Sequence, residues 1–162
     1  MIILGIDPGT AITGYGLIEA SGSNYSLLDY GCIRTATKQP TPQRLHKLYR
    51  GMLQLLTDHH SQQVAVEKLF FNRNASTAIP VGQARGVLLL ACAESDIEVA
   101  EYTPLQVKQT VTGYGRAEKQ QIQFMVARLL RMKTPPKSDD AADALAIALT
   151  HAHYYHTRRL RG

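Results

Sequence analysis

Four carboxylates in this sequence have neighbours that suggest a chemical role. Asp7 ends an apolar segment at a Pro-Gly turn, and Glu67 lies in or just after a second apolar segment. Asp140 and Asp143 are three residues apart in the first turns of a helical segment, so both project from nearly one face. Asp139 is adjacent and stands at i,i+4 from Asp143, which makes it a competitor for the same role.

Taken together, these acids predict a site for divalent metal ions. Clustered carboxylates repel one another unless cations neutralise them, and hard oxygen ligands suit Mg²⁺ or Mn²⁺. Two such ions about 4 Å apart can activate a water and stabilise the leaving oxygen in phosphodiester cleavage. The sequence offers no better nucleophile, because it has no Gly-x-Ser-x-Gly motif and no cysteine paired with a suitable base.

Each acid taken singly also has a structural explanation. Asp7 before Pro-Gly can order a turn through its side chain. Asp139, Asp140 and Asp143 can cap a helix and interact with its dipole, since acids favour the first turn. Glu67 is harder to explain in this way, because an acid in an apolar strand is costly to bury without a partner. The spacing alone therefore leaves both interpretations open.

The length and composition predict one compact domain over residues 1–162. Apolar residues make up 44% of the 162 residues, which predicts a single sizeable core. Cys32 and Cys92 form neither a zinc signature nor a disulfide framework, which favours a reducing compartment. No segment has the length and apolarity of a signal peptide or a membrane span, so we expect a soluble, cytoplasmic protein with no membrane partner.

The net charge of +5 fits a polyanionic partner but is weak by itself. Its distribution is more informative, because Lys108, Arg116 and Lys119 form one cluster. A second cluster, at 158–161, belongs to a basic C-terminal tail that we expect from about residue 155.

The apolar patterning predicts an α/β layer architecture with the order βββαβαβα and extra C-terminal helices. The expected strands are 1–7, 12–19, 25–34, 63–69 and 97–102, the first three forming an antiparallel meander. The first helix ends near 59–60, and the second follows a polar loop from 72 to about 78, with Pro80 in its first turn. Thr103 is the expected N-cap of a short helix that 113–115 breaks, an amphipathic helix contains 122–130, and Ser138 or Asp139 opens the last helix.

Five motifs in order resemble the RuvC family of crossover-junction endonucleases over about 140 residues. The first motif is 5–10 with 13–16, the second is 66–67 with Phe70, and the third is 82–87. The fourth motif is 106–109 with Gly113, Gly115, Lys119 and Gln121, and the fifth is 140–146. The resemblance implies an RNase H-like fold with a five-stranded mixed sheet, three antiparallel N-terminal strands and flanking helices. It also implies a homodimer that resolves four-way (Holliday) junction DNA by paired symmetric nicks, in DNA recombination and repair.

The same resemblance assigns roles to particular residues. It makes Asp7, Glu67, Asp140 and Asp143 the catalytic, metal-binding acids of a hydrolase with two Mg²⁺ per active site, for which Mn²⁺ would substitute, and it selects Asp140 over Asp139. It also implies a branch-migration helicase complex as a partner. In the resulting hypothesis Asp7 bridges the two ions, Glu67 completes one shell and the paired aspartates the other. In-line attack of water then leaves a 5′-phosphate and a 3′-hydroxyl.

DNA contacts are expected from basic and aromatic side chains around these acids. Lys119, with Lys108, would contact phosphate or offset charge in the transition state, although simple phosphate or solvent contact explains both lysines equally well. The resemblance favours Phe70 over Phe71 as a residue that stacks on an unpaired base. Further candidates for phosphate contacts are Arg73, Arg85 and Arg116.

The dimer interface is expected on the helix at 80–94, through Val81, Val87, Leu88 and Leu89, although a helix facing the core would look the same.

Three other functions are weighed against this hypothesis. A sugar-kinase or actin-like ATPase also begins with a strand ending in Asp-x-Gly-Thr, but needs a second lobe and a second phosphate motif. The second alternative is a nuclease for RNA:DNA hybrids or a YqgF-type relative. The sequences Gly-Gln-Ala-Arg-Gly at 82–86 and Asp-Ala-Ala-Asp at 140–143 argue against both. A DNA-binding module with a dead site is disfavoured because all four acids are retained.

Overall fold

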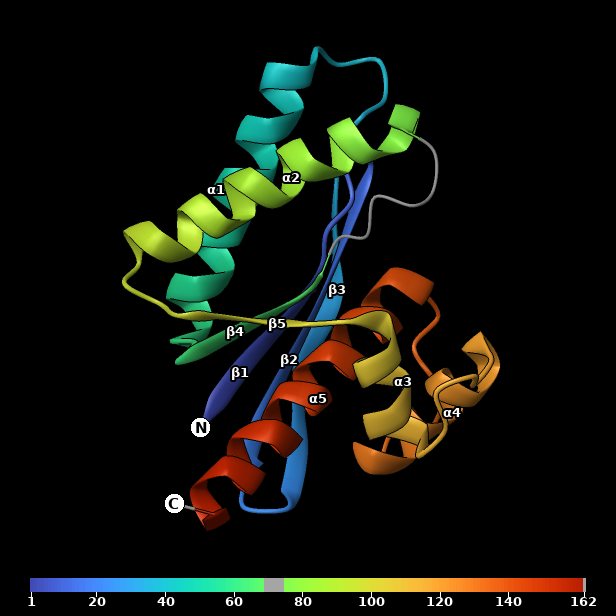
Figure 1. Ribbon diagram of the computed structural model, residues 1–162. Coiled ribbons are helices and arrows are strands. Elements are labelled where there is room, and N and C mark those ends of the chain that lie inside the picture. Colours follow the sequence, from blue (N-terminus) through green and yellow to red (C-terminus); the bar gives the residue numbers. More distant parts are fainter. Residues whose placement is uncertain (69–74, 162) are drawn as a thin grey trace.

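A five-stranded mixed sheet forms the centre of the molecule. The computed structural model describes residues 1–68 and 75–161 (Figure 1). The strands are β1 (Ile2–Asp7), β2 (Ile12–Ser21), β3 (Asn24–Arg34), β4 (Gln63–Glu67) and β5 (Val99–Tyr102), in the spatial order β3-β2-β1-β4-β5. β1, β2 and β3 are antiparallel neighbours, whereas β4 is parallel to β1 and β5 is parallel to β4. The mixed sheet with three antiparallel N-terminal strands is thus confirmed.

Helices cover both faces of this sheet. α1 (Thr41–His59) and α2 (Ala75–Glu94) lie on one face, and α3 (Pro104–Thr112), α4 (Lys119–Leu129) and α5 (Asp139–Arg161) lie on the other (Figure 1). Successive strand residues point to opposite faces, so β1 contributes Leu4 and Ile6 to the core under α1 and α2, and Ile3 to the core under α5. Asp7 has the same parity as Ile3 and therefore belongs to the α5 face.

α5 lies unusually close to the sheet because three glycines face it. A Cβ atom at Gly5 would stand 2.1 Å from the Ala144 carbonyl oxygen, and one at Gly14 would stand 2.0 Å from the Asp140 carbonyl oxygen. A Cβ atom at Gly16 would meet the Leu145 backbone nitrogen at 2.7 Å. These distances are shorter than van der Waals contact, so only glycine fits at these positions. The glycines fix both the height and the register of α5 above the sheet.

Local capping chemistry sets the limits of α3, as the sequence predicts. The Thr103 hydroxyl accepts a hydrogen bond from the Gln106 backbone N–H at 3.1 Å, and the Gln106 side chain accepts one from the Thr103 backbone N–H at 2.8 Å. Pro104 occupies the first helical position. Gly113, with φ of 74°, ends the helix in the left-handed conformation that glycine adopts without strain.

The predicted start of α2 is wrong. The helix already includes Ala75, so part of the expected polar loop is helical and Pro80 lies inside the helix instead of in its first turn. An interior proline cannot donate to the carbonyl four residues earlier and is costly there. Packing offsets this cost, because Ala84, Leu88 and Ala91 are buried in the core shared with α1.

Composition alone does not describe the end of α5 or the apolar character of α2 correctly. The basic C-terminal residues from about 155 lie in the last turns of α5. By length and composition, Ser76–Glu94 could cross a membrane. Its Arg85 forms an ion pair with Glu101 of β5, however, and its buried residues pack on α1, so α2 is a helix of the globular fold.

We predict that Gly5→Ala lowers the free energy of unfolding by at least about 2 kcal/mol, because the methyl group would push α5 away from the sheet. Gly82→Ala is the matched control, since a Cβ atom there meets nothing within 4 Å and alanine favours a helix. Chemical denaturation measures both variants. Equal stability of the two would contradict the close packing of α5.

Candidate active site

Asp7 and Glu67 lie side by side at one edge of the sheet. β1 and β4 are parallel and pair up to Ile6 and Val66, so Asp7 and Glu67 are the next residues at the carboxyl ends of adjacent strands. Glu67 shares the parity of Ala65, which is buried under α5. Both side chains therefore emerge on the face of the sheet that α5 covers.

The first two turns of α5 bring Asp140 and Asp143 to the same place. Gly14 is the antiparallel partner of Asp7, and the Asp140 carbonyl oxygen packs directly against Gly14. The structure thus brings together four acids that are distant in the sequence. The sequence places these acids at a strand end and a helix start, and their role as metal ligands stays a prediction.

The electrostatics of Asp7 show how closely these charges interact. Burial, followed by the charges of Asp143, Glu67 and Asp140, raises the pKa of Asp7 from 3.8 to about 7, against a smaller lowering by Lys119. Asp7 is therefore the carboxylate at the centre of the group, because the charges of all three other acids raise its pKa.

The pKa values of Glu67 and Asp143 are raised as well. Burial and the charge of Asp143 raise the pKa of Glu67, and Lys108 opposes them. Burial also raises the pKa of Asp143, and Lys119 is the largest opposing influence. Two lysines are thus the cations that partly neutralise this group of acids.

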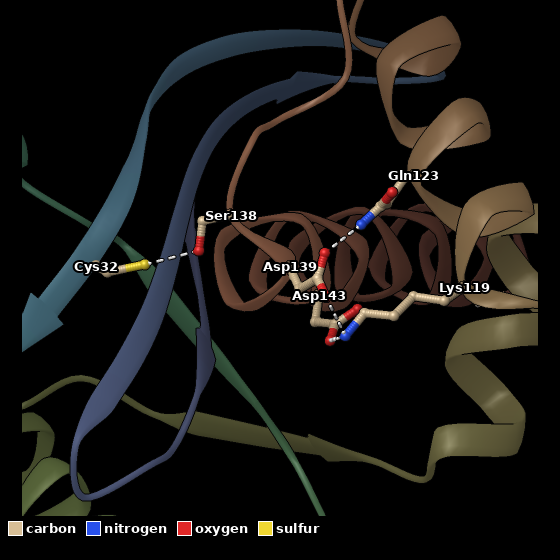
Figure 2. A network of polar contacts seen from close by, with 6 residues as sticks. All are labelled: Cys32, Lys119, Gln123, Ser138, Asp139 and Asp143. Carbon is tan, nitrogen blue, oxygen red and sulfur yellow. Dashed lines mark hydrogen bonds and ion pairs between the residues drawn. The ribbon is translucent and has the colours of Figure 1, made fainter.

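Asp139 is turned away from the group and toward α4. Its carboxylate accepts from Lys119 Nζ at 3.0 Å and from Gln123 Nε2 at 2.7 Å, as Figure 2 shows. Lys119 Nζ also lies 3.7 Å from Asp143. The hydrogen bond from Lys119 lowers the pKa of Asp139. Asp140 contributes to the raised pKa of Asp7, whereas Asp139 and Asp140 both contribute to the raised pKa of Asp143.

A cleft of about 220 Å³ opens beside the acids, between α3, α4 and α5. Glu67 and Asp143 contribute acidic groups to its wall, and Lys108 and Lys119 contribute basic ones. The remaining wall is apolar and consists of Pro104, Val107, Ile122, Ala146 and Ile147. The cleft thus presents carboxylates and ammonium groups together, which suits a phosphodiester held by cations.

The chemistry of the donors fits divalent cations. All four candidate ligands are carboxylates, and the raised pKa of Asp7 reflects negative charge that lacks enough compensation. Within residues 1–68 and 75–161, no three acidic, histidine or cysteine side chains already stand close enough to enclose an ion.

The other predicted DNA contacts fall in different places. Lys108 and Lys119 line the cleft, and Arg116 is exposed between α3 and α4. Arg85 lies on the opposite face of the sheet, where it pairs with Glu101 at 2.6 Å, and it is not part of this site. Phe70, Phe71 and Arg73 lie outside the described residues.

Two polar contacts at the site escaped the sequence interpretation. The Gln123 side chain donates a hydrogen bond to Asp139. Gln123 lies one helical turn after Lys119 on α4, and this spacing could have indicated that both side chains face the same acid. Cys32 Sγ lies 3.1 Å from Ser138 Oγ just before α5 (Figure 2). No local pattern links these two residues, because they are far apart in the sequence.

Comparison with known proteins decides the family. A family model described as crossover junction endodeoxyribonuclease RuvC matches residues 3–151. The chain belongs to the RuvC family. A RuvC from Desulforamulus reducens is 60% identical over 97% of this chain and 96% of its own, and one from Desulfitobacterium hafniense is 60% identical over 94% and 93%. The structure of Thermus thermophilus RuvC in complex with a Holliday junction substrate matches with a TM-score of 0.93 and 36% identity, covering 98% of this chain and 96% of that one. RuvC proteins are metal-dependent nucleases, and this fold and its acids are consistent with that class.

The raised pKa of Asp7 predicts a pH-dependent stability when divalent metal is absent. A carboxyl group with a higher pKa in the folded state binds its proton more tightly there, so its contribution favours folding at low pH and is lost as pH rises from about 4 through about 7. Thermal unfolding in EDTA should therefore show the wild type losing on the order of 3 kcal/mol between about pH 5 and about pH 8.

Asp7→Asn should largely remove this pH dependence, and added Mg²⁺ should restore wild-type stability at the higher pH by binding the folded state. Parallel pH profiles of the wild type and the variant would contradict the electrostatic coupling of Asp7.

Proposed function

We propose that this protein is a Mg²⁺-dependent endonuclease that resolves four-way junction DNA by paired symmetric nicks, in DNA recombination and repair. The observation that carries the proposal is the convergence of Asp7, Glu67, Asp140 and Asp143 beside a cleft that Lys108 and Lys119 line. The junction in the Thermus complex and the named activity of the relatives support the substrate.

The position of each acid suggests its part in holding metal. Glu67, Asp140 and Asp143 would hold the cations together with Asp7, whose carboxylate is the one on which all three others act. Two Mg²⁺ ions, for which Mn²⁺ would substitute, would supply an activated water and neutralise the leaving 3′ oxygen. The expected products are a 5′-phosphate and a 3′-hydroxyl.

The two lysines would act on the DNA strand. Lys108 on α3 and Lys119 on α4 reach the cleft from different helices, so they can contact phosphate oxygens on either side of the cut. The ion pair with Asp139 holds Lys119 near Asp143 and limits the directions in which its ammonium group points. Lys119 would thereby offset charge that develops in the transition state. Arg116 would extend these phosphate contacts.

A homodimer would match the two-fold axis of an ideal four-way junction. Leu88 is buried in the core and Val87 and Leu89 pack against it, so these three residues are taken up by the fold of the single chain. The outer face of α2 carries Ile79, Gln83, Gly86 and Leu90, at helical spacing, and the two large apolar residues are 69% and 53% exposed. We place the interface on this face, where Gly86 would allow close approach of a second helix.

Other assignments rest on family resemblance alone. These are base stacking by Phe70, a phosphate contact by Arg73, and the partnership with a branch-migration helicase complex. A cytoplasmic location follows from the same resemblance.

The assignment of Asp7 predicts that Asp7→Asn loses at least about 100-fold in cleavage rate with Mg²⁺, while junction binding is retained, because the substitution removes a metal ligand but adds no steric bulk. Asp58→Asn is the matched control, since Asp58 is exposed on α1, away from the acids. Gel assays with four-way junction, linear duplex and RNA:DNA hybrid measure cleavage and specificity. Substantial nicking by Asp7→Asn, or equal cutting of all three substrates, would overturn the proposal.

The proposed interface predicts that Leu90→Glu raises the dimer dissociation constant at least about tenfold, because it buries a charge between two apolar helices. Sedimentation velocity gives the dissociation constant, and a cruciform plasmid distinguishes paired cuts from single nicks. Leu160→Glu is the control, since Leu160 is 74% exposed near the end of α5. Unchanged association of Leu90→Glu would place the interface elsewhere.

A further inference from the structure

The positive charge of the chain is concentrated in one part of the fold. Residues 104–138, which we call the α3–α4 lobe, carry seven of the 18 lysines and arginines but only one of the 13 acids, Glu118. The lobe therefore has a formal charge of +6, and the rest of the chain has −1. A surface of this kind attracts a polyanion.

A groove of about 560 Å³ on this lobe has an aromatic wall. Tyr114 and Phe124 line the groove and are 56% and 57% exposed, and Ala117 and Met125 contribute apolar surface. Its remaining lining, Thr112, Gln120 and Gln121, is polar and uncharged. The Arg128 guanidinium lies over the Phe124 ring at 5.8 Å from its centroid. The groove thus combines exposed π-faces with a neighbouring cation.

This combination fits a nucleobase better than other ligands. Exposed aromatic rings inside a basic surface stack on bases, and the cations hold the phosphates of the same strand. A base paired within a duplex has no free face to offer, so the occupant must be unpaired. An apolar peptide would use the rings equally well but would gain nothing from the +6 charge of the lobe.

The groove lies close to the candidate active site. Lys119 lines the cleft and Gln120 and Gln121 line the groove, so the first turn of α4 separates the two. Phe124 is five residues beyond Lys119, which is about 7.5 Å along the helix axis. At about 3.4 Å per nucleotide, this distance corresponds to two or three nucleotides of a DNA strand.

We propose that the groove between Tyr114 and Phe124 binds an unpaired nucleobase of a DNA strand that passes over the α3–α4 lobe. The inference extends the proposed nuclease function, because it places the base two or three nucleotides from the cut. Arg128 contacts the phosphate of that nucleotide, and the base stacks on the exposed part of the Phe124 ring.

The test measures binding of a fluorescent short oligothymidylate by anisotropy in EDTA, where no cleavage occurs. Phe124→Ala should weaken binding about tenfold, and Phe124→Tyr should retain it, because tyrosine keeps the aromatic face. Leu105→Ala is the matched control, since Leu105 is 54% exposed on the same lobe but has no ring; its affinity should change less than about twofold. Tyr114→Ala should repeat the loss, and thermal unfolding verifies that each variant is folded.

Two further readouts separate stacking from charge. Binding of a fully paired linear duplex should change less than about twofold in Phe124→Ala, because a duplex offers no free base. The slope of log affinity against log salt should stay constant in this variant, whereas Arg116→Gln should reduce it by about 1.

An unchanged oligothymidylate affinity in folded Phe124→Ala would overturn the inference, and so would an equal loss of affinity for duplex DNA. An apolar peptide would then be the better candidate for the groove. Because the assay uses neither metal nor junction, failure of junction cleavage would count only against the proposed function.

Discussion

The close contact between α5 and the glycine face of the sheet determines where the α5 aspartates lie relative to Asp7. Gly5, Gly14 and Gly16 let the helix backbone approach where any side chain would collide. The Asp140 carbonyl oxygen packs against Gly14, which pairs with Asp7 across β1 and β2. The start of α5 is therefore aligned with the end of β1. A helix held farther from the sheet would carry the same acids, but they would not meet Asp7.

This alignment has an electrostatic cost that explains the chemistry of the site. Asp7 is buried among three other carboxylates, and its pKa rises to about 7 in consequence. Lys108 and Lys119 offset part of the repulsion, Lys119 through its ion pairs with Asp139 and Asp143. The remaining negative charge favours divalent cations at the centre.

Sequence reasoning succeeded where local chemistry decides the structure. The capping box at Thr103 is such a local signal. The four acids are distant in the sequence, and the resemblance to a family, not their spacing, selected them. Sequence reasoning failed where distant contacts decide. Pro80 lies inside α2 because packing on α1 outweighs the lost hydrogen bond. Arg85 of α2 forms an ion pair with Glu101 of β5, which no local pattern indicates. The pairing of Lys119 with an exposed aspartate likewise depends on how α4 lies against α5.

The central claim is that the four acids bind divalent cations together. A crystal structure of this protein grown with Mn²⁺ tests it most directly, because anomalous scattering locates the metal independently of any activity. The account predicts two manganese peaks in contact with Asp7, flanked by Glu67 on one side and by the α5 aspartates on the other. Manganese bound only elsewhere, or no peak at these carboxylates when the crystals are saturated with metal, would contradict it.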